Sequence, residues 1–171
     1  MALHIIIDGY NLIRQSIRLS FLDAGDLESG RTALLESLAA YHRRRPQHRL
    51  TVVFDGWQGG ELRQTQDLFQ GVKIIFSRRG ERADEVIKRL LNNERQRALM
   101  VSSDRELQHW ADRVGAAWVE ASRFETMYLN ANSNASAEGE DDSPAQGTKK
   151  KGPARRKSKR ERLRQQRLKK L

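Results

Sequence analysis

The stretch Leu3–Ile13, LHIIIDGYNLI, joins an apolar strand to an acid and to the start of a helix. Its first part, Leu3–Ile7, is a continuous apolar run that only His4 interrupts, and such runs are typical of strands in a buried parallel sheet. Asp8 follows the strand directly, and an apolar helical pattern begins near Leu12. The sequence therefore opens with a strand-helix unit that carries a carboxylate at the end of its strand.

The alternation of strands and helices continues to about residue 130. Leu50–Phe54 and Val72–Phe76 are β-branched and aromatic, and Ala98–Val101 and Ala116–Val119 are shorter strand candidates. Apolar residues at helical spacing predict helices around Leu34, Leu35, Leu38 and Tyr41; Ala83, Val86, Ile87, Leu90 and Leu91; Leu107, Trp110, Ala111 and Val114; and Phe124, Tyr128 and Leu129. This order predicts an α/β sandwich around a mostly parallel sheet of five strands, formed by residues 1–130.

Charge divides the rest of the 171-residue chain into two further segments. Residues 1–130 carry a net charge of +2, residues 131–148 carry −4, and residues 149–171 carry +12. We predict a flexible acidic linker at 131–148 and a basic tail at 149–171, which is disordered alone and binds RNA.

Several classes of protein are excluded by what the sequence lacks. It contains no cysteine, which excludes disulfides, thiolate zinc sites and thiol catalysis. The histidines have no ligand spacing, and there is no G-x-S-x-G, P-loop or G-x-G-x-x-G motif. No apolar segment has the length of a signal peptide core or a membrane span. We expect a cytoplasmic protein without membrane contact.

Acids follow the predicted strands at the point where each strand ends. Asp8, Asp55 and Asp104 follow three different strands, and Asp84 lies near the start of the helix after Val72–Phe76. The carboxyl ends of parallel strands meet at one edge of a sheet, where ligands bind, so we expect the four carboxylates to converge. An all-oxygen cluster suits Mg²⁺ or Mn²⁺, either of which activates water for attack on a phosphate.

Each acid also has a purely structural interpretation. The structural alternatives are turn pairs at Asp8-Gly9 and Asp55-Gly56, a capping box of Ser103 and Glu106 with Asp104 in the first helical turn, and surface ion pairs Asp84–Lys88 and Glu85–Arg89. Asn11 could likewise cap the helix that begins near Leu12, or hydrogen-bond a phosphate or a water on the metal. The convergence of four acids favours a functional site over these separate roles.

Five motifs in order resemble a known family. They are IIIDGYNLI (Ile5–Ile13), VVFDG (Val52–Gly56), RRGERADEVI (Arg78–Ile87), VSSDRELQ (Val101–Gln108) and VEASRFE (Val119–Glu125). The set is similar to the YacP-like branch of the NYN domains, which are relatives of PIN nucleases. The resemblance covers about residues 3–130, and the tail lies outside it.

The resemblance implies a PIN-like three-layer sandwich and divalent-metal-dependent cleavage of single-stranded RNA. Asp8, Asp84 and Asp104 match the family's acidic metal site, and Asp55 matches a further catalytic acid. Asn11 and Ser103 match its polar supports, which we assign to substrate binding. Because this branch includes ribosome-associated endoribonucleases, messenger or ribosomal RNA on the ribosome is the expected partner.

Three arginines complete the predicted site. Arg78, Arg79 and Arg82 lie just before Asp84, where phosphate oxygens need positive partners, although each one alone is also consistent with a solvated loop. The leading hypothesis is an endoribonuclease. The alternative is a non-catalytic module that binds RNA or the ribosome through its basic tail. A metal-dependent phosphatase is weaker, because Gly9-Tyr10 follows Asp8 where a D-x-D pair would be needed.

Overall fold

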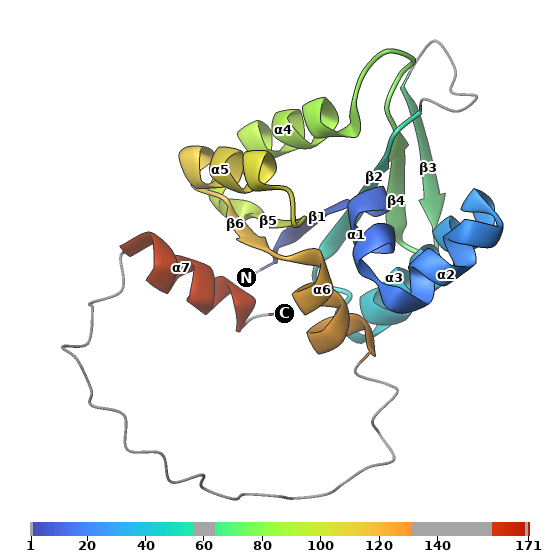
Figure 1. Ribbon diagram of the computed structural model, residues 1–171. Coiled ribbons are helices and arrows are strands. Elements are labelled where there is room, and N and C mark those ends of the chain that lie inside the picture. The colour runs from blue at the N-terminus through green and yellow to red at the C-terminus, as the bar shows by residue number, and fades with distance from the viewer. Residues whose placement is uncertain (1, 57–63, 131–158, 170) are drawn as a thin grey trace, which may run out of the picture.

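A mixed sheet with the strand order β3-β4-β2-β1-β5-β6 forms the centre of the molecule (Figure 1). The computed structural model describes residues 2–56, 64–130, 159–169 and 171. The strands in this part of the chain are β1 (His4–Asp8), β2 (Arg49–Phe54), β3 (Thr65–Phe69), β4 (Val72–Phe76), β5 (Ala98–Val101) and β6 (Ala117–Val119). Each neighbouring pair is parallel except β3 with β4, which is antiparallel. Most strands therefore end at the same edge.

Burial on both faces explains why the inner strands are apolar throughout. In β1, Ile5 and Ile7 belong to one core and Ile6 to the other, because successive side chains in a strand point to opposite faces. Val52 and Val53 of β2 divide between the two cores in the same way. Each core lies between one face of the sheet and the helices that cover it.

Helices cover both faces of the sheet (Figure 1). The first face is packed against α1 (Gly9–Gln15), α2 (Ile17–Gly25), α3 (Leu27–Arg44), α6 (Ala121–Phe124) and the π-helical turn η2 (Glu125–Leu129). The second face is packed against α4 (Ala83–Glu94) and α5 (Arg105–Val114), with the 3₁₀ turn η1 (Arg95–Arg97) leading into β5. The predicted α/β sandwich is thereby confirmed.

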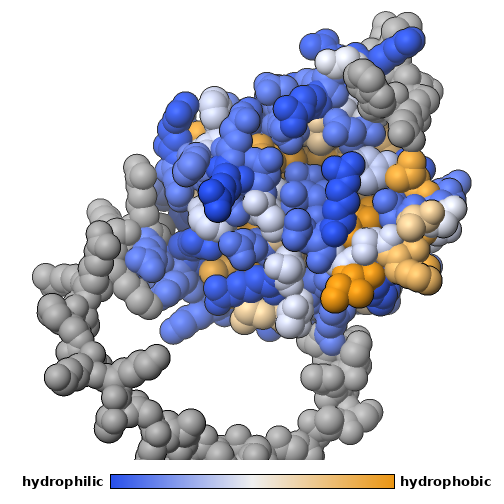
Figure 2. All heavy atoms as spheres, in the orientation of Figure 1, coloured by the Kyte–Doolittle hydropathy of each residue, from blue (hydrophilic) through white to orange (hydrophobic). Residues whose placement is uncertain are grey.

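The sheet has six strands in the described residues, not the five that the sequence predicts. The additional strand, β3, is largely exposed and lacks an apolar alternation. It returns to β4 through Gln70 and Gly71, whose φ angles of 45° and 87° suit a two-residue hairpin turn. Helix α2 was not predicted either, because Ile17 and Phe21 are 91% and 82% exposed instead of facing the core. Figure 2 shows apolar side chains gathered on the side of the molecule where α2 lies.

The end of the basic tail differs from the expected disorder. Residues Lys159–Leu168 form helix α7, which lies against β6. The Arg164 guanidinium lies 3.4 Å from the centre of the Trp118 ring, and its Nε donates to the Trp118 carbonyl at 2.8 Å. Arg167 is buried and donates to the Gly115 carbonyl. Stacking and carbonyl contacts therefore dock a segment that has few apolar residues. The predicted linker 131–148 and residues 149–158 lie outside the described residues.

None of the helices in the described ranges combines the length and the apolar character that a membrane crossing requires.

Candidate functional site

Asp8 is a buried carboxylate at the carboxyl end of the central strand β1. Its Oδ1 accepts a hydrogen bond from the Asn11 backbone N–H at 3.2 Å, which caps α1 and starts this helix at Gly9, earlier than the predicted Leu12. Its Oδ2 accepts from the Ser102 hydroxyl at 3.3 Å. The pKa of Asp8 is raised from 3.8 to about 6, mainly by burial and also by the carboxylates of Asp84 and Asp55, against the two hydrogen bonds, which lower it.

Asp84 lies in the first turn of α4, on the second face of the sheet. Burial raises its pKa, and the carboxylates of Asp104 and Asp55 act in the same direction. Arg82 opposes these effects: its guanidinium is 2.7 Å from Asp84 Oδ2 and is 75% exposed. The interactions among Asp8, Asp55, Asp84 and Asp104 show that the fold brings the four predicted acids to one edge.

Asp104 and Asp55 hold the backbone of the helices that carry the site. Asp104 Oδ1 accepts from the backbone N–H groups of Glu106 at 2.7 Å and Leu107 at 3.1 Å, so Asp104 is the N-cap of α5. Asp55, which is exposed, accepts from the Ala83 N–H at 2.7 Å and so fixes the start of α4 relative to β2. Each of these acids therefore has a structural role in addition to its place at the edge.

The capping box predicted for Ser103 and Glu106 is wrong, because Asp104 takes the capping position. The Ser103 hydroxyl instead accepts from the Ala121 N–H at 3.2 Å, which connects the site to the segment after β6. The Ser103 N–H donates to Asn11 Oδ1 at 2.8 Å. This hydrogen bond joins α1 to the segment after β5, beside Asp8.

Ser102 is the residue that the sequence reasoning missed. It is fully buried, donates to Asp8, and accepts from the Asp104 N–H at 3.1 Å, so it connects two of the acids directly. The available signal was the first serine of the Ser102-Ser103-Asp104 run, since a hydroxyl directly after the buried strand β5 lies at the same edge as the acids.

The predicted arginines lie on the loop before α4 and differ in their surroundings. Arg78 lies 3.7 Å from Glu81, Arg82 is paired with Asp84, and Arg79 is exposed. The expected surface pairs are replaced by others. Asp84 pairs with Arg82 instead of Lys88, Arg89 pairs with Glu81 instead of Glu85, and Lys88 bridges Glu85 on α4 and Glu106 on α5.

The edge presents oxygen donors of the type that divalent ions bind. Carboxylate and amide oxygens are what Mg²⁺ and Mn²⁺ prefer, and Mg²⁺ commonly uses only one or two carboxylates and keeps several waters. In the described residues, no three His, Cys, Asp or Glu side chains form a complete metal-binding group. Asp8 and Asp84, the two acids with raised pKa values, are the pair best suited to share such an ion.

The histidines near the sheet have structural surroundings. His4 forms a 2.7 Å hydrogen bond with Thr51, and burial lowers its pKa. His48 Nδ1 accepts from the Leu3 N–H at 3.2 Å. Both lie at the amino ends of β1 and β2, away from the acids.

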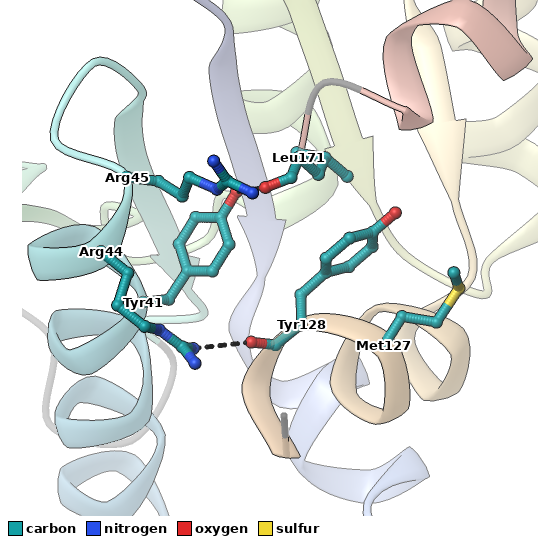
Figure 3. A pocket seen from close by; sticks show the side chains of 6 residues that line it. All are labelled: Tyr41, Arg44, Arg45, Met127, Tyr128 and Leu171. Atoms are coloured by element: carbon teal, nitrogen blue, oxygen red, sulfur yellow. Dashed lines mark hydrogen bonds between the residues drawn. The ribbon is translucent and has the colours of Figure 1, made fainter. Parts of the chain in front are cut away.

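A cavity of about 300 Å³ lies at the other end of the sheet, where α3 leads into β2 (Figure 3). The side chains of Tyr41 and Arg45 point toward Leu171, and Arg44 donates to the Tyr128 carbonyl at 2.9 Å. Leu171 is buried and burial raises the pKa of Tyr41 to about 12. The described residues that line this cavity include no Asp or Glu, and Leu171 packs among them at the end of the tail.

The sandwich and the acids at its carboxyl edge define a PIN-like nuclease fold. Two crystal structures of Rae1 (YacP) from Bacillus subtilis, one of a mutant, match the chain with TM-scores of 0.57 and 0.55, at 28% and 30% identity. They cover 70% and 69% of this chain and 70% and 68% of theirs.

The chain belongs to the YacP-like NYN domain family, whose model matches residues 5–171. It is 35% identical over 112 residues to the uncharacterized protein YacP of Bacillus subtilis (strain 168). That match covers 63% of each protein, so the chain spans somewhat less than two thirds of this relative's length. The family match includes the tail, which the resemblance read from the motifs had left out.

Proposed function

We propose that this protein is a divalent-metal-dependent endoribonuclease that cleaves single-stranded RNA. The observation that carries the proposal is the buried Asp8 carboxylate, whose pKa is raised to about 6 beside the carboxylates of Asp84 and Asp55. Clustered acids destabilise a protein unless a cation compensates for their charge. A cluster of this kind on a nuclease fold is best explained by a metal that the reaction uses.

Asp8 and Asp84 are the proposed direct ligands. Asp104, whose carboxylate caps α5, is proposed as a third ligand that joins them when an ion is bound, and Asp55 is the proposed further acid. A divalent ion held there would supply charge that stabilises the phosphate under attack and would activate a water. Ser102 and Asn11 keep Asp8 in place by hydrogen bonds, and Asp55 holds the start of the helix that carries Asp84. The protein thus supplies a positioned set of oxygens at an open edge.

The arginines beside the acids are the proposed phosphate contacts. Arg82 is three-quarters exposed and already lies against a carboxylate of the cluster, so a phosphate bound there comes within its reach. Arg78 and Arg79 extend the positive charge along the same loop. Phosphate contacts of this kind fix the position of the strand without reading its sequence.

The alternative function, a module that binds RNA or the ribosome only through its basic tail, is less well supported. Arg164 and Arg167 of that tail are engaged with the domain, so they contribute less to RNA binding than the net charge suggests. A pure binding module also has no use for four acids that repel RNA. Residues 149–158 still supply basic charge suited to the ribosome, and we retain ribosome association as a part of the proposal.

The test is cleavage of an end-labelled single-stranded RNA by the full-length chain in Mn²⁺, Mg²⁺ or EDTA. We expect internal cuts with a divalent ion and none in EDTA. Asp84→Asn should abolish cleavage, whereas Asp67→Asn, on the exposed edge strand β3, should leave it unchanged. Mn²⁺ should also raise the melting temperature of the wild type by mass action, and much less that of Asp84→Asn. Full activity of Asp84→Asn would refute the site.

A further inference from the structure

Three aromatic rings form a row at the carboxyl edge of the sheet, on the first face. Tyr10 comes two residues after Asp8, Phe54 immediately before Asp55, and Phe76 at the end of β4. The centres of Tyr10 and Phe54 are 5.1 Å apart in an edge-to-face contact, and those of Phe54 and Phe76 are 5.6 Å apart and nearly parallel. Phe54 is fully buried, but Tyr10 and Phe76 at the ends of the row are only partly buried.

An arginine lies over each of the two outer rings. The Arg14 guanidinium is 6.0 Å from the centre of the Tyr10 ring, and the Arg31 guanidinium is 5.6 Å from that of Phe76. The two arginines come from different helices, α1 and α3, and Arg14 is exposed. In the described residues, neither of them forms an ion pair with an acid. Arg31 also interacts electrostatically with Asp26, but no ion pair holds either guanidinium, so both groups can meet a phosphate.

The other arginine-aromatic contacts of the described chain are explained by the fold. Trp118 is covered by Arg164 of α7, which also bonds to the Trp118 carbonyl. Trp110 lies on the outer side of α5, between Lys88 and Arg113, and its indole N–H donates to Asn92. Among the arginine-aromatic contacts of the described residues, only the Tyr10 and Phe76 pairs lie at the edge where the acids converge.

We propose that Tyr10 and Phe76, with Arg14 and Arg31, form a subsite that binds bases and phosphates of single-stranded RNA next to the cleaved bond. Aromatic rings interspersed with cationic groups are what unpaired nucleotides require, because every base has a face for stacking and every linkage carries a negative charge. A base-paired duplex presents no free base face, so the subsite selects single strands.

The positions of the acids and the rings set the path of an RNA strand across the edge of the sheet. Asp84 and Asp104 belong to helices on the second face, the ring row belongs to the first face, and Asp8 lies between them at the end of β1. A strand that places a phosphate at the acids therefore places its neighbouring nucleotides over the rings. This inference rests on the proposed nuclease function, but the binding of RNA to the subsite can be measured without cleavage.

The test is binding of two fluorescent hexanucleotides to the full-length chain in EDTA, one of uridines and one with abasic residues. We expect the wild type to bind the uridine strand about tenfold more tightly than the abasic strand, because the stacking of one base on an aromatic ring contributes about this much to affinity. Tyr10→Leu and Phe76→Leu should each reduce that preference, while Tyr10→Phe should retain it. Urea unfolding of each variant checks that the fold is intact.

The charge component has its own control. Arg14→Ala and Arg31→Ala should each lower the salt dependence of binding by about 0.7, the value for one phosphate contact on a single strand. Arg43→Ala, which is exposed on α3 and bonds to Gln70, should leave it unchanged.

Equal binding of the two strands by the wild type, or an undiminished preference in both leucine variants, would overturn the subsite. Loss of salt dependence without any base preference would also overturn it, because charge alone would then account for binding. If the leucine variants lose the preference but no variant cleaves RNA, the subsite stands and the nuclease proposal fails. In an active enzyme, Tyr10→Leu should raise KM and leave kcat unchanged.

Discussion

Replacing Asp8 with asparagine removes a charge that the fold keeps away from water. In the folded protein the pKa of this carboxyl is about 6, against an ordinary value of 3.8. The folded state therefore binds the proton more tightly than the unfolded state, so ionisation of Asp8 lowers the free energy of unfolding as the pH rises from 3.8 to 6. Each pKa unit corresponds to about 1.4 kcal/mol, which gives a total cost of about 3 kcal/mol above this range.

Asp8→Asn should remove this cost, because the amide stays neutral. The difference in free energy of unfolding between the variant and the wild type should grow by about 2 kcal/mol between pH 4 and pH 7, in favour of the variant. Any loss of hydrogen bonds to Ser102 or Asn11 adds an offset, but that offset does not depend on pH. The change with pH therefore isolates the carboxylate.

The assay is urea unfolding of both proteins in EDTA at several pH values, with Asp67→Asn as a control. The control should show less than about 0.5 kcal/mol of change, as expected for an exposed substitution. A difference between Asp8→Asn and the wild type that is constant from pH 4 to pH 7 would show that Asp8 is not a buried, ionisable group. Addition of Mn²⁺ at pH 7 should reverse the order of stability, because only the wild type retains the full set of ligands.

Three other substitutions test the contacts around the site and the tail. Gly9→Ala should lower the free energy of unfolding by about 1–3 kcal/mol in urea titrations, because the added Cβ would lie 2.3 Å from the Phe54 ring. The control is Gly25→Ala, which should be neutral or slightly stabilising because its added Cβ meets no atom within 4 Å. Ser102→Ala should lower kcat for RNA by about tenfold and move the acid limb of the pH-rate profile to higher pH, because the Ser102 hydroxyl lowers the pKa of Asp8. An acid limb at the same pH as in the wild type would argue against this positioning role. Arg164→Ala should reduce the free energy of unfolding by about 1–2 kcal/mol, and Gln166→Ala, at an exposed position of the same helix, by less than about 0.5 kcal/mol. Equal effects in chemical unfolding would contradict the docking of α7 on Trp118.

The sequence predicted the elements whose burial requires a recognisable pattern of apolar residues. β1 and β2 are apolar because both faces of the sheet are covered, and the position of Asp8 and Asp55 at their ends follows from parallel topology. β3 and α2 could not be predicted in this way, because their side chains are largely exposed and no repeating apolar position marks them.

The details of the site depend on contacts between distant segments. Asp104 caps α5, whereas the Ser103 hydroxyl accepts a hydrogen bond from the backbone N–H of Ala121, a residue that follows β6. The cap of α5 therefore depends on a contact with a distant segment. The pairing of Asp84 with Arg82 likewise depends on the path of the loop before α4. Sequence patterns predict which residues reach the edge, and tertiary contacts decide which groups they bond.

The docking of α7 also affects how the sheet meets other molecules. β6 is the last strand on its side, and the outer strand of a sheet offers unpaired backbone groups to any extended chain nearby. Arg164 occupies the carbonyl of Trp118, and its guanidinium covers the indole ring, so the tail shields this border. A chain that loses its last residues would expose a strand edge with a bare tryptophan, and self-association through β6 is the expected fate of such a fragment. We therefore expect the basic tail to keep the domain from associating through β6, apart from any contact that the tail makes with RNA.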